Sequence, residues 1–253
     1  MLNSREGLLG REKEVMKILN LLSEQNLDFI VVGGYAISTY KKRFSVDLDI
    51  VIQERDLKKF EDLLIKKGYA LSYNKKVELL YGEKFKRFEK KMKGLAVDVD
   101  FLINGLVSRT TDSTWSFDYI KKNSEKRKLD NSEFLTPKRE LIVAMKFHSG
   151  RLSDIRDIVA LMPCSKEELK EHLLKGNIEK LKSSMKRQLE FLQKPQFDDS
   201  FKGIFGIHMY REKNVKDAIG LIKGLLATQE TKIPNSMFGF LKRKTKSFTR
   251  KQS

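Results

Sequence analysis

Two aspartates, Asp47 and Asp49, lie two positions apart in the apolar run Val46-Asp47-Leu48-Asp49-Ile50. The strict alternation predicts a strand with both carboxylates on one face and the apolar side chains on the other. Like charges about 6–7 Å apart along a strand repel each other. A half-buried strand tolerates them when a cation bridges the carboxylates, and Mg²⁺ is the natural ion because it prefers carboxylate and phosphate oxygens. The pattern therefore predicts a magnesium site with Asp47 and Asp49 as ligands.

A glycine pair precedes these acids. The compact apolar run Phe29–Val32 predicts a buried strand that ends at Gly33 and Gly34, and residues 35–40 then have helical character. A helix that begins after two glycines presents free backbone N–H groups with no Cβ in the way, so it can hold a phosphate. A glycine pair alone is usually a turn, and an Asp-x-Asp pair alone is usually a solvated strand edge. Together in one short stretch they indicate a site for a nucleotide and a metal.

A second acidic strand is predicted at 95–103, where the sequence is LAVDVDFLI. Alternation places Asp98 and Asp100 on one face, and acids within such an apolar strand are costly unless they are paired or bound to metal. Periodicity does not distinguish the two. Asp98 is preferred as the third metal ligand because more strand follows it, which would place it deeper, and both acids remain candidate catalytic residues.

The composition limits the function classes. With 51 Lys+Arg against 34 Asp+Glu, the net charge of +17 favours polyanionic partners such as nucleic acid, although a lysine-rich surface can also serve solubility alone. Cys164 is the single cysteine, which excludes an internal disulfide and fits a reducing compartment. The three histidines are far apart, which argues against a zinc site. No signal peptide or membrane span is recognisable, so we expect a cytoplasmic protein.

The order of predicted elements indicates an α+β fold, with a small mixed β-sheet core flanked by helices and followed by an all-helical C-terminal half. A helix is expected at 12–23 and another at 55–67, short strands at 69–73, 77–81 and 84–91, and an irregular polar segment at 104–132. Thr136 and Pro137 read as the cap and first residue of a helix. Later helices are expected at 151–162, 165–174, 177–193, 200–210 and 215–228.

Three segments are expected: a catalytic core at 1–135, a helical domain that completes the site at 136–231, and a basic tail at 232–253. The tail contains no acidic residue. It could be a frayed, solvated end or an arm that binds a polyanion, and the sequence does not decide between them.

Gly33-Gly34, Asp47-Leu48-Asp49-Ile50 and a later acidic strand together resemble the nucleotidyltransferase superfamily, which has the polymerase-β-like fold. The resemblance covers about residues 8–104. A narrower likeness is to the AbiEii/AbiGii-toxin-like nucleotidyltransferases, whose G-G-x-A…R-x-T-x-D-h-D signature is similar to residues 33–49, with Ser45 where threonine is common. A later motif of that family is similar to residues 141–161. Its matching positions are Lys146, Arg151, Asp154 and Asp157, and Ser153 departs from it, since a basic residue often precedes the first aspartate.

The resemblance implies a role for each matching position. Asp47 and Asp49 would hold one or two Mg²⁺ ions, and an acid of the third strand would act as a base or as a further ligand. Gly33, Gly34, Ser38, Arg43 and Ser45 would contact the nucleotide phosphates, and Lys146 and Asp154 would complete the pocket from the helical side.

The expected function is transfer of NMP from an NTP, such as ATP, to an acceptor hydroxyl. The narrower likeness suggests the end of an RNA such as tRNA as the acceptor, in a toxin–antitoxin context with an antitoxin protein as partner. One alternative is transfer to a small molecule or a protein side chain, although the positive charge argues mildly against a cationic antibiotic. Another is a nucleotide- or RNA-binding module without turnover.

Overall fold

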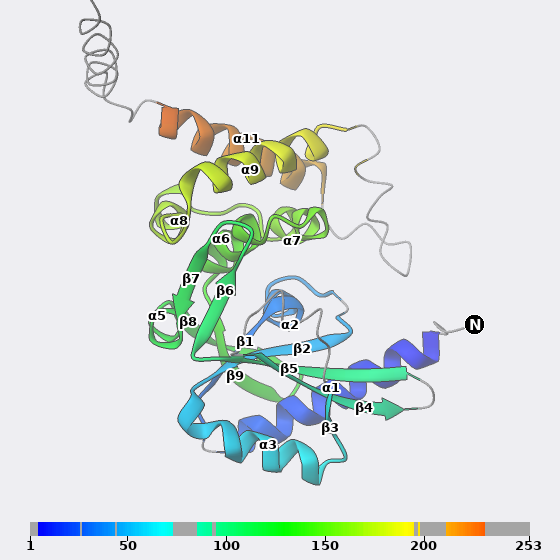
Figure 1. The fold of residues 1–253 in the computed structure, drawn as a ribbon. Coiled ribbons are helices and arrows are strands. Elements are labelled where there is room, and N and C mark those ends of the chain that lie inside the picture. The colour runs from blue at the N-terminus through cyan, green and yellow to red at the C-terminus, as the bar shows by residue number, and fades with distance from the viewer. Residues whose placement is uncertain are drawn as a thin grey trace, which may run out of the picture.

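A computed structural model describes residues 5–25, 27–43, 45–72, 85–92, 95–194, 197 and 211–230 (Figure 1). The first half combines helices with a β-sheet, and only helices follow residue 138 within the described part of the chain. The elements are α1 (Arg5–Glu24), β1 (Phe29–Val32), α2 (Gly33–Ser38), β2 (Asp47–Ile52), the 3₁₀ turn η1 (Glu54–Asp56), α3 (Leu57–Lys66), β3 (Ala70–Ser72), β4 (Phe85–Met92), β5 (Leu95–Ile103), β6 (Gly105–Ser108), β7 (Ser113–Ser116), α5 (Phe117–Lys122), β8 (Ser124–Leu129), β9 (Ser132–Pro137), α6 (Arg139–Ser149), η2 (Leu152–Asp154), α7 (Ile155–Ala160), α8 (Lys166–Leu173), α9 (Ile178–Leu192) and α11 (Glu212–Glu230).

A seven-stranded mixed sheet carries the predicted acids. Its strand order is β3-β4-β5-β2-β1-β9-β8. β2 lies in the centre, antiparallel to β1 and parallel to β5. The two strands that bear Asp-x-Asp pairs are therefore direct neighbours, and the expected α+β class with a mixed sheet is confirmed.

One face of this sheet is covered by α1 and α3, which lie on the same side of it in Figure 1. Leu48 and Ile50 of β2 and Val99 and Phe101 of β5 pack there in one buried cluster with Phe60 of α3. Burial of each such side chain contributes about 1.5–3 kcal/mol, which fixes the register of both strands. The alternation predicted for β2 and β5 is confirmed, because their acids lie on the opposite face.

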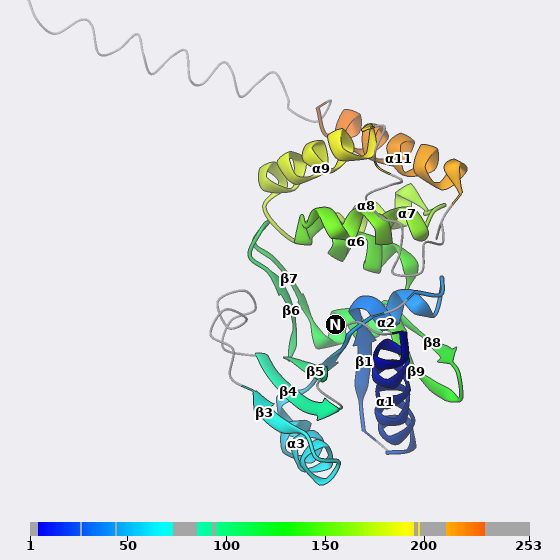
Figure 2. The same cartoon turned by 90° about the vertical axis from the view of Figure 1, so that its right-hand side faces the viewer.

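The helices α6 to α9 and α11 form a second region with its own core. Figure 2 shows β6 and β7 rising from the sheet toward these helices. The β6–β7 hairpin is attached to the segment between α8 and α9 by two backbone hydrogen bonds. Thr114 N donates to Lys175 O (3.2 Å), and Asn177 N donates to Thr111 O (2.6 Å). Among the described residues, no helix is both long and apolar enough to span a membrane.

Two expectations for residues 104–137 were wrong. The segment 104–132 is not irregular, since it contains β6, β7, α5 and β8. These elements are too short for periodicity to reveal, and buried Trp115 and Phe117 hold them in place. Thr136 and Pro137 end β9 instead of starting a helix, which begins at Arg139. Parallel pairing of β9 with β1 overrides the local capping signal. The strand predicted at 77–81, the helix predicted at 200–210 and the basic tail lie outside the described residues.

Candidate active site

The glycine pair lies against the acidic strand. Gly33 has φ +62°, and a Cβ added to it would lie 1.9 Å from Asp49 Oδ2. A Cβ on Gly34 would lie 2.2 Å from Ser45 Oγ. Both positions exclude a side chain, Gly33 for its backbone conformation as well as for space. The glycines thus allow α2 to begin directly beside the carboxylates.

Three carboxylates converge on the face of the sheet opposite α1 and α3. Asp47, Asp49 and Asp100 each offer one oxygen, and these atoms lie within 4.8 Å of one another. The pKa of Asp49 is raised well above its usual value by burial and by the neighbouring charges of Asp47 and Asp100, although Lys146 and Arg151 lower it. An all-oxygen set that repels itself in this way fits a hard divalent cation, so the triad could bind a metal.

Asp98 does not belong to this group of oxygens. Parallel pairing places Asp98 beside Asp47 and Asp100 beside Asp49. Asp98 Oδ1 is buried without a hydrogen-bond partner among the described residues, and burial raises the pKa of this carboxyl. The structure therefore brings Asp100, and not Asp98, to the predicted metal ligands. The length of strand that follows an acid is a poor measure of its depth, because the neighbouring strands decide it.

Arg87 is a site residue that the sequence analysis missed. β4 pairs with β5 so that Arg87 lies opposite Asp100. Arg87 Nε and Nη2 donate to the two oxygens of Asp100 at 2.7 and 2.6 Å, and Nη1 lies 3.6 Å from Asp98 Oδ2. Burial raises the pKa of Asp100 to about 6 even though these hydrogen bonds lower it. A predicted hairpin between residues 85–92 and 95–102 would have placed Arg87 opposite Asp100.

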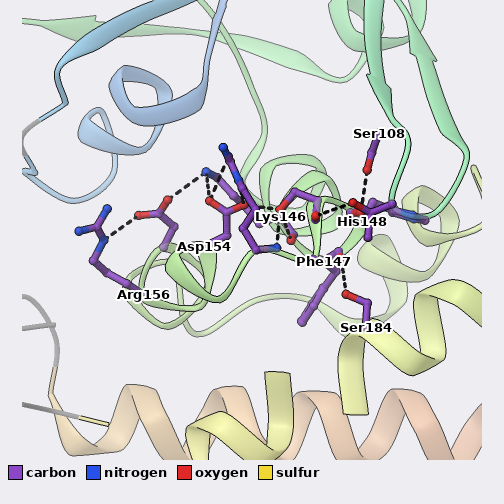
Figure 3. A network of polar contacts seen from close by, with 12 residues as sticks. Ser108, Lys146, Phe147, His148, Asp154, Arg156 and Ser184 are labelled. Atoms are coloured by element: carbon purple, nitrogen blue, oxygen red, sulfur yellow. Dashed lines mark hydrogen bonds and ion pairs between the residues drawn. The ribbon is translucent and has the colours of Figure 1, made fainter. Parts of the chain in front are cut away.

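Lys146, predicted from the helical side, is buried in an ion-pair network (Figure 3). Its Nζ lies 2.8 Å from Asp154 Oδ1 and 3.0 Å from Asp157 Oδ2. Burial lowers the pKa of Lys146, but the two carboxylates outweigh it and raise the pKa above its usual value. Arg151 Nε donates to Asp154 Oδ2 at 3.0 Å. The helix predicted over 151–162 is divided into η2 and α7, and Asp154 lies at their junction.

The loop between α2 and β2 joins the two sides of the site. Arg43 Nη1 donates to Asp157 Oδ1, so the loop is paired with α7. Ser38 Oγ donates to the carbonyl oxygens of Gly34 (3.0 Å) and Arg43 (2.9 Å), which makes it a brace of the loop. Ser45 Oγ donates to Asp47 Oδ1 at 3.0 Å. Phosphate contact by Ser38 and Ser45 stays a prediction.

The arrangement places an acidic face opposite a basic one. The sheet supplies Asp47, Asp49 and Asp100, while the helical side supplies Lys146 and Arg151, whose charges reach Asp49. Such a pair of faces can hold a cation and a polyanion together, which a metal–nucleotide complex combines.

Comparison with known proteins supports this chemistry. The sequence profile of a family described as "uncharacterised nucleotidyltransferase" matches residues 9–178. No functionally curated protein is similar to the chain by sequence.

Several solved structures are similar at low identity. A candidate nucleotidyltransferase from H. pylori is 16% identical, with a TM-score of 0.50 over 89% of this chain and 97% of that one. JHP933 from Helicobacter pylori is 14% identical, with a TM-score of 0.48 over 96% and 100% of the two chains. The lincosamide antibiotic adenylyltransferase LnuA, bound to lincomycin, is 18% identical, with a TM-score of 0.42 over 64% and 97%. At these identities the first likeness shows the fold alone, and the other two add no argument.

The profile covers both acidic strands, the glycine pair and the Lys146 network. The chain therefore belongs to this family of nucleotidyltransferases.

Proposed function

We propose that the protein is a cytoplasmic, Mg²⁺-dependent enzyme that transfers NMP from an NTP to the hydroxyl of an RNA end. The observation that carries this proposal is the acidic triad of Asp47, Asp49 and Asp100 beside a basic wall that contains Lys146 and Arg151. An NTP carries its triphosphate with a divalent cation, so the two faces match the two charges of that ligand. Membership of the family supports the transfer reaction.

Each group has a defined task in this scheme. Asp47 and Asp49 would hold Mg²⁺, which neutralises phosphate charge when it is bound. Lys146 and Arg43 would orient the triphosphate, and the turn at Gly33 would bring backbone N–H groups close to it. A bond then forms between the acceptor oxygen and the α-phosphorus while the bond to pyrophosphate breaks. A carboxylate of β5 would accept the hydroxyl proton.

Asp100 is the better placed of the two β5 acids for that task. It lies within the triad, and Arg87 fixes its orientation through two hydrogen bonds. Asp98 is half-buried, its Oδ1 has no hydrogen-bond partner within the described part of the chain, and it remains a candidate for a further ligand.

The choice of RNA as acceptor has separate support. The net charge of +17 favours a polyanion, and the likeness of residues 33–49 and 141–161 to AbiEii/AbiGii-toxin-like enzymes favours a tRNA end in a toxin–antitoxin setting. An antitoxin protein would then be a partner. Small molecules and protein side chains are the alternative acceptors.

The test is incubation with labelled NTPs, Mg²⁺ and total RNA. We expect label on RNA from wild type, loss of at least about 100-fold in Asp47→Asn and Asp49→Asn, and loss with EDTA. Asp112→Asn is the matched control, because Asp112 is an exposed acid paired with Lys180. No transfer with any NTP would refute the enzyme. Label on protein or on an added antibiotic, and not on RNA, would refute the acceptor.

A further inference from the structure

Asp157 lies buried where α6, α7 and the loop between α2 and β2 meet, and the proposed function assigns it no task. Asp157 belongs to α7 and is only 1% exposed. Oδ2 lies 3.0 Å from Lys146 Nζ of α6, and Oδ1 accepts a hydrogen bond from Arg43 Nη1 of the α2–β2 loop. Arg156 Nε lies 3.6 Å from Oδ1. One oxygen of this carboxylate thus contacts Lys146 on the helical side, and the other contacts Arg43 in the loop on the sheet side.

This arrangement is more than charge neutralisation. Asp154, at 2.8 Å, and Asp157, at 3.0 Å, both pair with Lys146, so pairing with Lys146 is not what distinguishes Asp157. A buried carboxylate is costly, and replacement of a buried pair by apolar residues is often neutral or stabilising. What Asp157 adds is a fixed distance between Lys146 and Arg43, which come from chain segments more than a hundred residues apart.

Arg43 is held beside the glycine turn. Its Nη2 lies 3.5 Å from the position that a Cβ on Gly34 would occupy. Its carbonyl oxygen accepts the hydrogen bond of Ser38, so backbone and side chain are both fixed. The partner of its Nη1 is Asp157. A change at Asp157 would therefore remove one of the contacts that hold this guanidinium next to the proposed phosphate turn.

We infer that Asp157 is a positioning residue, which sets the separation of Arg43 at the glycine turn from Lys146 on the helical side. The inference rests on the proposed function, in which these two cations orient the triphosphate of the NTP. Asp157 itself does not contact the substrate. Its effect on NTP binding and on the transfer step passes through Arg43 and Lys146, the two cations that it contacts.

The experiment is a double-mutant cycle of Arg43→Gln, Asp157→Asn and the pair of changes together. NTP affinity is measured by equilibrium binding with Mg²⁺ and without acceptor, and KM and kcat are measured in transfer. Loss of one charge-assisted hydrogen bond corresponds to a change of about tenfold or more. We expect each single variant to weaken NTP binding by about tenfold, and the double variant to be no weaker than the worse single variant. Asp157→Asn should also lower kcat more than Arg43→Gln, because it alone loosens Lys146.

Asp112→Asn, which removes an exposed acid from the pair with Lys180, should change none of these values. If Asp157→Asn fails to fold, Asp157→Glu keeps the charge and shifts the oxygens, and the same cycle is run with it. Unchanged NTP affinity in the Asp157 variant, or independent effects that multiply to about 100-fold in the double variant, would overturn the inference. Wild type that binds NTP without transfer would refute the proposed function only, and the binding cycle would still decide the inference. Wild type that binds no NTP would refute both.

Discussion

Replacement of Gly33 by alanine tests whether the glycine pair is required by the acids beside it. Gly33 has φ +62°, a conformation that costs a residue with a Cβ about 1–2 kcal/mol. The added Cβ would lie 1.9 Å from Asp49 Oδ2, whereas real Cβ contacts essentially never fall below 3.0 Å. The Asp49 carboxylate must therefore move by about 1 Å, the difference between these two distances.

The backbone strain at Gly33 and the displacement of the Asp49 carboxylate set the expected losses of stability and of transfer rate. Strain of about 1–3 kcal/mol lowers the free energy of unfolding, and each kcal/mol corresponds to about 2–4 °C in Tm for a chain of this size. A misplacement of about 1 Å in a reacting site can cost about 100-fold in rate. Gly33→Ala should therefore lose about 100-fold of transfer while it remains folded at 25 °C.

Gly220→Ala is the matched control, because Gly220 lies in α11 with nothing within 4 Å of an added Cβ. That change should raise stability by about 0.5–1 kcal/mol, as expected for glycine within a helix, and leave transfer intact. Thermal unfolding and the labelled-NTP assay measure both variants. A Gly33→Ala protein with the Tm and the transfer rate of wild type would refute the packing argument.

Two further predictions concern stability. Lys146→Met leaves Asp154 and Asp157 without their shared buried cation and should cost about 3–5 kcal/mol in urea unfolding, whereas Lys180→Met at an exposed pair should cost less than about 1 kcal/mol; equal losses would contradict the burial argument. Burial lowers the pKa of His148 to about 4, so its contribution is fully present above the unfolded value of 6.5 and is lost as pH falls toward 4. Between pH 6.5 and 4 wild type should lose on the order of 3 kcal/mol at this residue, and His148→Gln should flatten that part of the stability curve.

The acidic strands and the glycine turn could be predicted from sequence because each is a local pattern. Period-2 alternation decided which side chains of β2 and β5 face the core, and burial of Leu48 and Val99 bears it out. The choice between Asp98 and Asp100 could not be made locally. It depends on strand pairing, which sets Asp100 beside Asp49 and opposite Arg87.

Arg87 and Thr136 are two further positions whose structure depends on strand pairing and not on the local sequence. Arg87 looks like one basic residue among many until β4 is paired with β5. Thr136 and Pro137 carry a good helix-start signal, yet they end a strand because β9 pairs with β1. In both cases a contact between distant segments outweighs the local preference.

The strand order also bears on how the sheet avoids pairing with other chains. In the sheet formed by the described residues, one edge is β8, whose Lys126, Arg127 and Lys128 discourage addition of a further strand. The other edge of that sheet is β3 (Ala70–Ser72). Between them, β9 covers the outer side of β1, whose run Phe29–Val32 is wholly apolar. A fragment that stops before β9 would expose that run as an edge and invite aggregation. Shortened forms made to isolate the acidic strands should therefore extend beyond Pro137.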